Sequence, residues 1–206
     1  MSLEPDPRNH GGPSAPTFHF TFNASVADFN VPPKTYLASH PEFDAIATGA
    51  LVTSRRESGG RQLLLIQRAA HDSMPSRWEV PGGACDLDDA TLLHGLAREL
   101  WEETGLLLRR VVGRVGLGRG NGGGLGKGSE DGAVFFTRRG LRVIKYSFLV
   151  DVEQPPGIKL DPNEHQRFLW ATEEECRAGR VGDVEIKFTT DQQTATIMEG
   201  FGVGKE

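Results

Sequence analysis

The chain has 206 residues, and 28 Asp and Glu against 23 Lys and Arg give it a formal net charge of −5. A chain of this length can bury a sizeable core, and its acidic charge gives no general attraction to a nucleic-acid backbone, so we expect one main domain and no duplex nucleic-acid partner. No apolar run approaches the length of a membrane span and the N-terminus lacks a hydrophobic signal segment, so we expect a cytoplasmic or otherwise intracellular protein with no membrane partner.

The first 44 residues differ in composition from the rest of the chain. Residues 1–16 are rich in Pro, Gly and Ser, which predicts a disordered N-terminal tail. Residues 17–44 are expected to form an N-terminal extension. Within it, Phe18–Phe22 alternates aromatic and polar residues as an added strand would. Residues 23–44 are expected to form a connection, because Pro32-Pro33 interrupts any regular element there. The main domain is expected over 45–206.

After strand patterns at 45–54 and 62–68, a short strand, a turn and a helix are predicted between residues 77 and 105. The strand Arg77–Val80 breaks at Pro81, and the two glycines that follow, Gly82 and Gly83, allow a sharp turn and a close approach to a ligand. An apolar repeat then predicts a helix over 90–104. Its N-cap is expected to be Asp88, Asp89 or Thr91, and its C-cap Gly105.

Three carboxylates share one face of this predicted helix. Glu99, Glu102 and Glu103 fall within an arc of roughly 100°, opposite a core stripe. The stripe consists of Leu93, Leu96, Ala97 and Leu100. Mg²⁺ prefers oxygen ligands and is usually held by carboxylates, waters and substrate phosphates, so the cluster fits a cation site. The alternative is a solvated acidic face, and the glycine turn upstream favours the cation site.

This segment resembles the signature box of the Nudix hydrolases. Gly83 is followed by Arg-Glu-aliphatic-x-Glu-Glu-x-Gly-aliphatic at positions 98–106, with leucine at both aliphatic positions. The first half of the box departs from the pattern, which has a Glu six residues after the glycine and seven residues between that Glu and the Arg. Here Asp89 stands in place of the Glu, and eight residues separate it from Arg98. Asp89 is therefore expected either to assist the metal site or only to cap the helix.

The resemblance implies an α/β fold, namely an α/β/α sandwich with a mixed central sheet, over roughly residues 45–200. It also implies a pyrophosphohydrolase that uses Mg²⁺ or Mn²⁺ to hydrolyse a nucleoside diphosphate linked to another moiety. By resemblance, Gly83 supplies a backbone ligand and Arg98 orients the acids. Glu99, Glu102 and Glu103 are expected to bind metal, with Glu99 and Glu102 as the candidates for proton transfer.

The remaining elements are predicted from local patterns. Strands are expected at 110–115 and, most clearly, at 142–152, separated by a Gly-rich loop at 116–132. The loop matches G-x-G-x-x-G, but no helix former follows it, so we do not assign it a phosphate cradle. A final helix is expected over 189–201.

Glu164 is the candidate for a further metal-binding acid, because it lies in a loop directly before an apolar strand that ends at Trp170. The alternative is that Glu164 and His165 are both ordinary surface loop residues. Cys85 and Cys176 are too few for a disulfide framework.

Substrate contacts are predicted at two further positions. Arg68 could meet a phosphate, with a solvent-exposed arginine as the alternative, and Trp78 could stack on a base, with a core tryptophan as the alternative. Two functions stay open: a hydrolase of a phosphoanhydride bond in a small-molecule nucleotide, and a catalytically weak or inactive Nudix-fold module that binds a nucleotide-like ligand or a protein partner. The sequence is compatible with a monomer or a homodimer.

Overall fold

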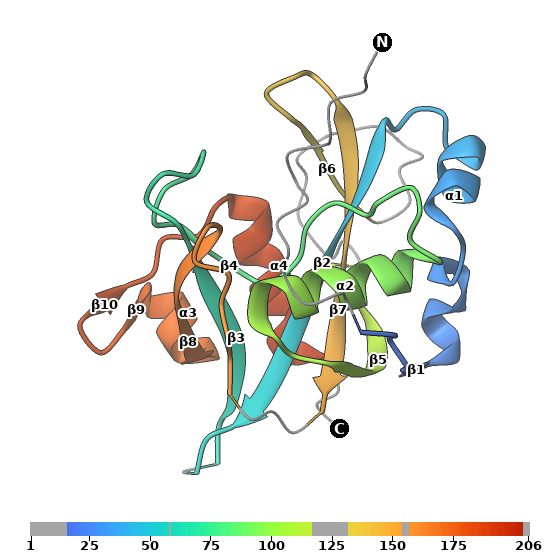
Figure 1. Cartoon of the computed structure of the whole chain (residues 1–206). Helices are drawn as coiled ribbons and strands as arrows, with labels where there is room; N and C mark the ends of the chain where they lie inside the picture. The colour runs from blue at the N-terminus through green and yellow to red at the C-terminus, as the bar shows by residue number, and fades with distance from the viewer. Residues whose placement is uncertain (1–15, 58, 117–131, 154–156, 204–206) are drawn as a thin grey trace.

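The computed structural model describes residues 16–57, 59–116, 132–153 and 157–203. These residues form a mixed eight-stranded sheet in the order β1-β5-β7-β2-β3-β4, with β6 added beside β7 and β8 beside β3 (Figure 1). The elements in chain order are β1 (Thr21–Phe22), η1 (Ala24–Phe29), α1 (Pro33–Ser39), β2 (Ala45–Arg55), β3 (Arg61–Arg68), β4 (Trp78–Glu79), α2 (Leu92–Thr104), β5 (Leu108–Val115), β6 (Ala133–Phe136), β7 (Arg142–Val152), β8 (His165–Thr172), α3 (Glu173–Ala178), β9 (Arg180–Val181), β10 (Val184–Glu185) and α4 (Asp191–Gly202).

The long strand β2 joins the two halves of the sheet. Its first part, Ala45–Val52, runs parallel to Val143–Val150 of β7, and its last three residues pair antiparallel with the start of β3. The predicted strands at 45–54, 62–68, 110–115 and 142–152 therefore correspond to β2, β3, β5 and β7. Buried apolar residues lie on both faces of β2, β3 and β7, because helices cover the central part of the sheet on both sides.

Helices cover the two faces and create two cores. Alternate residues of β3 point to opposite faces: Leu64 and Ile66 pack in the core beneath α2, and Leu63 and Leu65 pack in the core beneath α4. All four side chains are fully buried. The expected α/β/α sandwich with a mixed central sheet is confirmed.

The N-terminal extension is more structured than the sequence indicated. The expected strand over Phe18–Phe22 is reduced to β1, which pairs parallel with β5. The expectation of an irregular connection over 23–44 was wrong, because η1 and α1 lie there. Pro33 occupies the first turn of α1, where a missing N–H is tolerated and the fixed φ suits a helix. The Tyr36 hydroxyl meets the Tyr146 hydroxyl of β7 at 2.6 Å, so the extension packs on the sheet.

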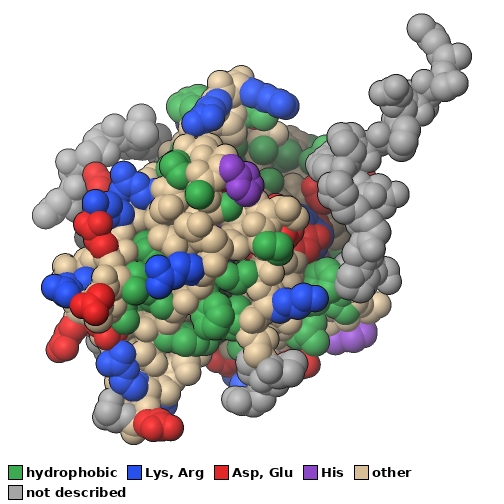
Figure 2. Space-filling model, turned by 60° about the vertical axis from the view of Figure 1, so that its left-hand side comes forward, with side chains coloured by type: hydrophobic (Ala, Val, Ile, Leu, Met, Phe, Trp, Pro, Cys, Tyr) green, Lys and Arg blue, Asp and Glu red, His purple; other side chains and the backbone are tan. Residues whose placement is uncertain are grey.

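Two predicted segments fall largely outside the described residues: the tail over 1–16 and the Gly-rich loop over 116–132, of which residues 117–131 are not described. Within the described part, no helix is both long and apolar enough to cross a membrane. On the face shown in Figure 2, acidic and basic side chains of the described residues are interspersed rather than gathered by sign.

Candidate metal centre

The helix α2 places the box residues, and its ends are set by local hydrogen bonds. Thr91 is the N-cap and its hydroxyl accepts the His94 N–H, while Gly105 ends the helix in the left-handed conformation with φ 70°. Of the three candidates for the N-cap, the structure thus selects Thr91. The predicted core stripe from Leu93 to Leu100 is fully buried, which fixes the rotation of the helix about its axis.

The three acids of α2 are not equally exposed, although the sequence placed them together on an outward face. The Glu102 side chain is 44% exposed, that of Glu99 is 14% and that of Glu103 is 7%. Glu103 turns inward and its Oε2 accepts the Gly82 N–H. Burial raises the pKa of Glu103 well above its usual range and the pKa of Glu99 to about 7.

The glycine turn packs directly against β2 and α2. Gly82 has φ 138°, and a Cβ there would lie 2.7 Å from the Cα of Gly49, so both the backbone angle and the space require glycine. A Cβ on Gly83 would lie 2.9 Å from the carboxyl carbon of Glu99. The Gly83 carbonyl accepts the Thr48 N–H at 2.8 Å, which uses one of its two lone pairs.

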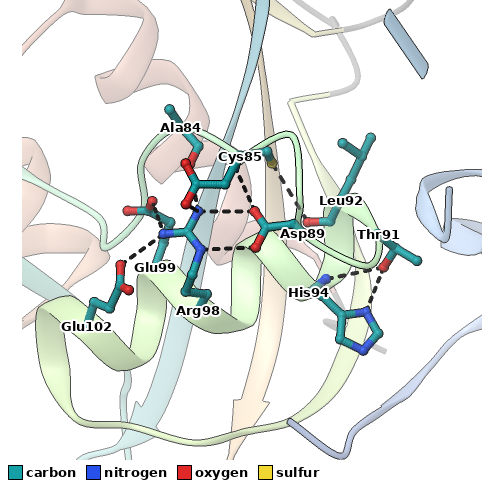
Figure 3. A network of polar contacts seen from close by, with 10 residues as sticks. Ala84, Cys85, Asp89, Thr91, Leu92, His94, Arg98, Glu99 and Glu102 are labelled. Carbon is teal, nitrogen blue, oxygen red and sulfur yellow. Dashed lines mark hydrogen bonds and ion pairs between the residues drawn. The ribbon is translucent and has the colours of Figure 1, made fainter. Parts of the chain in front are cut away.

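Arg98 connects the acids to the loop before the helix (Figure 3). Its Nε and Nη2 donate to the two carboxylate oxygens of Asp89 at 3.0 and 3.1 Å, and its Nη1 donates to Glu99 at 2.8 Å and to Glu102 at 2.9 Å. Nη2 also donates to the Ala84 carbonyl. Arg98 therefore contacts both Glu99 and Glu102, and Asp89 holds the guanidinium from the other side.

Asp89 reaches Arg98 despite the longer loop and the shorter side chain. The loop lies close to the helix at Gly95, where a Cβ would come within 2.8 Å of both Asp89 Oδ2 and Cys85 Sγ. Asp89 Oδ2 also accepts the Asp86 N–H at 2.7 Å, which folds the extra residue into a turn. Asp89 is not the helix cap, and it is not part of the group formed by Glu103, Glu164 and His165. Its carboxylate pairs with Arg98.

Glu164 lies close to the buried end of α2, beside Glu103. One ligand atom from each of Glu103, Glu164 and His165 lies within 4.8 Å of the other two. Glu164 is the exposed member of the three, and partial desolvation of its carboxyl group by the surrounding protein is the largest cause that raises its pKa. The interpretation of His165 as a surface loop residue was wrong, because this side chain is only 3% exposed.

Glu79 is a site residue that the sequence analysis missed. It is 7% exposed, and its Oε1 lies 2.6 Å from Nη1 of Arg68 and 3.3 Å from Nε2 of His165. Arg68 also contacts Asp72 at 2.6 Å, so its guanidinium lies between two carboxylates at the edge of the site. The only sequence signal for Glu79 was an acid inside a short apolar strand.

Trp78 does not lie in the site, and the prediction that it stacks on a base was wrong. Its side chain is 1% exposed within the core beneath α4, and its indole N–H donates to the Glu185 carbonyl at 3.0 Å. A ring enclosed on both faces offers no surface for a base. Trp78 instead anchors β4, which carries Glu79 into the site.

The sheet between two helical layers, with the box helix and its glycine turn on one face, is the Nudix type of fold. The family model of the NUDIX domain matches residues 45–191, and the chain therefore belongs to the Nudix family. A MutT-like protein of Streptomyces ambofaciens is 41% identical over 69 residues, which are 34% of this chain and 39% of that protein. The chain thus matches less than half the length of this curated relative.

Solved structures share the fold at low sequence identity. The NUDIX domain of Shewanella oneidensis NrtR, solved in complex with ADP ribose, aligns with a TM-score of 0.54 at 15% identity over 82% of this chain and 96% of that one. A MutT NUDIX hydrolase from Burkholderia pseudomallei aligns with a TM-score of 0.51 at 17% identity over 75% of this chain and 96% of that one. At these identities the likeness concerns the fold alone.

Proposed function

We propose that the protein is a divalent-metal-dependent hydrolase that cleaves a phosphoanhydride bond in a nucleoside diphosphate derivative or related nucleotide. The observation that carries this proposal is the inward turn of Glu103, a buried carboxylate beside Glu164 and close to the other acids of α2. Burying like charges costs free energy unless a counter-charge accompanies them. A cation held among these acids would supply that counter-charge.

The residue types fit Mg²⁺ or Mn²⁺. The Gly83 carbonyl and the carboxylates of Glu99, Glu102, Glu103 and Glu164 are hard oxygen ligands, and such ions retain sites for water and for substrate phosphates. When bound, the ion withdraws charge from phosphate oxygens and lowers the pKa of coordinated water. The protein contributes the geometry, since Glu103 is fixed by the Gly82 N–H and Arg98 contacts both Glu99 and Glu102.

In the proposed reaction the oxygen of water forms a bond to one phosphorus, and the bridging P–O bond breaks with its electrons passing to the departing phosphate. We assign the acceptor of the water proton to Glu99, with Glu102 as the second candidate, because both lie on the exposed side of the cluster and both contact Arg98. Arg68, between Glu79 and Asp72 at the edge of the site, stays our candidate for a contact to a substrate phosphate.

A substrate screen tests the proposal. The panel should contain nucleoside diphosphate derivatives including ADP ribose, which the Shewanella domain binds, together with oxidised nucleoside triphosphates and dinucleoside polyphosphates. Each compound is incubated with the full chain and Mg²⁺ or Mn²⁺, and phosphate-containing products are separated by chromatography. We expect turnover of at least one compound that stops with EDTA. Binding of a nucleotide without turnover under either ion would contradict the proposal.

The second candidate function is a binding module without turnover. Arg98 favours it, because its guanidinium already pairs with Glu99 and Glu102 without an ion. A catalytic centre must release these oxygens to the cation, whereas a binding module keeps the ion pairs. Calorimetric titration with Mg²⁺ distinguishes the two functions. A hydrolase binds the ion at the acids, and the Glu102→Gln substitution weakens that binding. A binding module that keeps its ion pairs binds no Mg²⁺ at the acids, so the substitution changes nothing.

A further inference from the structure

His165 is a buried imidazole that the surrounding protein satisfies poorly. Its Nε2 lies 3.3 Å from Oε1 of Glu79 and 3.8 Å from Oε1 of Glu103, both longer than the usual N–H···O distance of about 2.9 Å. Its Nδ1 is buried and has no hydrogen-bond partner among the described residues. Buried polar atoms are nearly always paired, so the described protein around this ring leaves one of its two nitrogens unsatisfied.

A β-bulge turns His165 toward the acids. In the ladder between β3 and β8, Gln67 pairs with Arg167, but Arg68 pairs with His165, so Gln166 has no direct opposite. Directly paired residues lie on the same face of a sheet, which puts His165 on the face of Arg68. Glu79 pairs with Ile66, two residues from Arg68, and so lies on this face too. Bulges often re-aim a side chain at a functional site, and this one brings an imidazole beneath the C-terminal end of α2.

We propose that His165 is a nitrogen ligand of the divalent cation, together with Glu103 and Glu164; this inference rests on the proposed function. The three candidate ligand atoms lie within 4.8 Å of one another. Ligands about 2.1 Å from one ion are at most about 4.2 Å apart, so a small side-chain adjustment would close this set around a cation.

The charges around the ring support a cation at this position. An imidazole lone pair directed at two carboxylates is repelled unless a proton or a metal ion lies between them. Glu79 already has a cationic partner in Arg68, whereas the hydrogen bond that Glu103 accepts within the described residues comes from the Gly82 backbone N–H. An ion between Glu103 and His165 therefore neutralises Glu103, the carboxylate of the two that has no arginine beside it among the described residues. The competing arrangement is an Nε2–H group that donates to the acids and binds no metal.

A nitrogen ligand changes the choice of metal. Mg²⁺ takes oxygen ligands almost exclusively, whereas Mn²⁺ and especially Co²⁺ accept imidazole readily. A site made only of carboxylates would discriminate less strongly between Mg²⁺ and these two ions. The protein should therefore bind Mn²⁺ and Co²⁺ more tightly than Mg²⁺, and His165 should account for a large part of the difference.

Pulsed electron paramagnetic resonance of Mn²⁺ bound to the full chain tests the ligand directly. With one equivalent of Mn²⁺ and no substrate, we expect electron spin echo modulation from nitrogen-14 that changes to the nitrogen-15 pattern when only the histidines are labelled. Bound Mn²⁺ without histidine coupling overturns the inference and leaves the proposed function standing. Failure to bind Mn²⁺ at all overturns both.

Variants give an independent measurement by calorimetric titration. Loss of outer-shell partners commonly weakens metal binding at least about tenfold, so His165→Gln should weaken Co²⁺ binding by that factor or more and Mg²⁺ binding much less. His71→Gln is the control, because His71 is exposed and its ring contacts the Asn163 backbone carbonyl rather than a carboxylate. Equal losses for both ions would indicate that His165 positions Glu103 and would overturn direct ligation. If His165→Gln does not fold, the labelled wild-type spectrum decides the question.

Discussion

The carboxylate of Glu99 occupies the space that a side chain at Gly83 would need. A Cβ at Gly83 would lie 2.9 Å from the Glu99 carboxyl carbon, and Gly83 does not have the positive φ that requires glycine elsewhere in the chain. Glycine is therefore required at position 83 because a larger side chain would collide with Glu99 of α2. Turn and helix form one unit, in which a change on one side displaces the other.

Gly83→Ala should consequently impair the site more than the fold. The added methyl group must push Glu99 away from its position beside Arg98, and we expect Mg²⁺ affinity and turnover to fall by roughly 10- to 100-fold, the scale of a lost outer-shell contact. Gly113→Ala in β5 is the matched control, because its Cβ would meet nothing within 4 Å. Calorimetry and thermal melts of both variants check this. Equal effects of the two substitutions would contradict it.

Asp89 and its neighbour Asp88 should behave differently when each is changed to alanine. Asp89, whose side chain is 8% exposed, makes two contacts to Arg98, and their loss should destabilise the protein by about 2 kcal/mol and lower turnover by freeing Arg98. Asp88 makes an exposed ion pair with Lys34, which should contribute little. Chemical denaturation and initial rates measure both effects. A silent Asp89→Ala would show that Arg98 is held by its other partners.

The sequence predicted those parts of the site that depend on local order. Caps and apolar spacing define α2 within a few residues, and the turn of Gly82 and Gly83 precedes it directly. The sequence also indicated Glu164, as an acid directly before a strand, and its role as a metal ligand stays a prediction. The bounds of β7 were also predicted, since its apolar pattern continues through the whole strand.

The parts that the sequence did not predict depend on contacts between distant segments. His165 enters the site through a bulge in the pairing of β3 with β8, and no local pattern marks which residue of β8 is left unpaired. Glu79 pairs with Ile66 in the sheet and is buried in an ion pair with Arg68, two residues further along β3. The same applies to Trp78, since its strand pattern did not reveal which face of the sheet α4 would cover.

Glu103→Gln should remove metal-dependent activity without unfolding the protein. The amide keeps an oxygen to accept the Gly82 N–H, and it avoids burial of a charge, so metal-free stability near pH 8 should be unchanged or higher by about 1 kcal/mol. Turnover should fall by at least about 100-fold, since a lost ligand costs no less than a lost outer-shell partner. Glu174→Gln, at an exposed position on α3, is the control. A Glu103→Gln protein that unfolds would show a structural role instead.

The raised pKa of Glu99 predicts how pH affects the metal-free protein. Burial raises this pKa to about 7, so the folded state binds the proton more tightly than the unfolded state does. The resulting stability is complete below the ordinary glutamate pKa of about 4.3 and is lost as the pH rises through about 7. In EDTA, the melting temperature of the wild type should therefore fall between about pH 5 and pH 8 relative to that of Glu99→Gln, in which this titration is absent.

Mg²⁺ binds the ionised carboxylate, so it should raise the wild-type melting temperature more at the upper pH than at the lower one. Thermal melts at fixed ionic strength give both differences. A wild-type curve parallel to that of Glu99→Gln, or a Mg²⁺ effect that is larger in acid, would mean that Glu99 ionises freely and does not bind the ion.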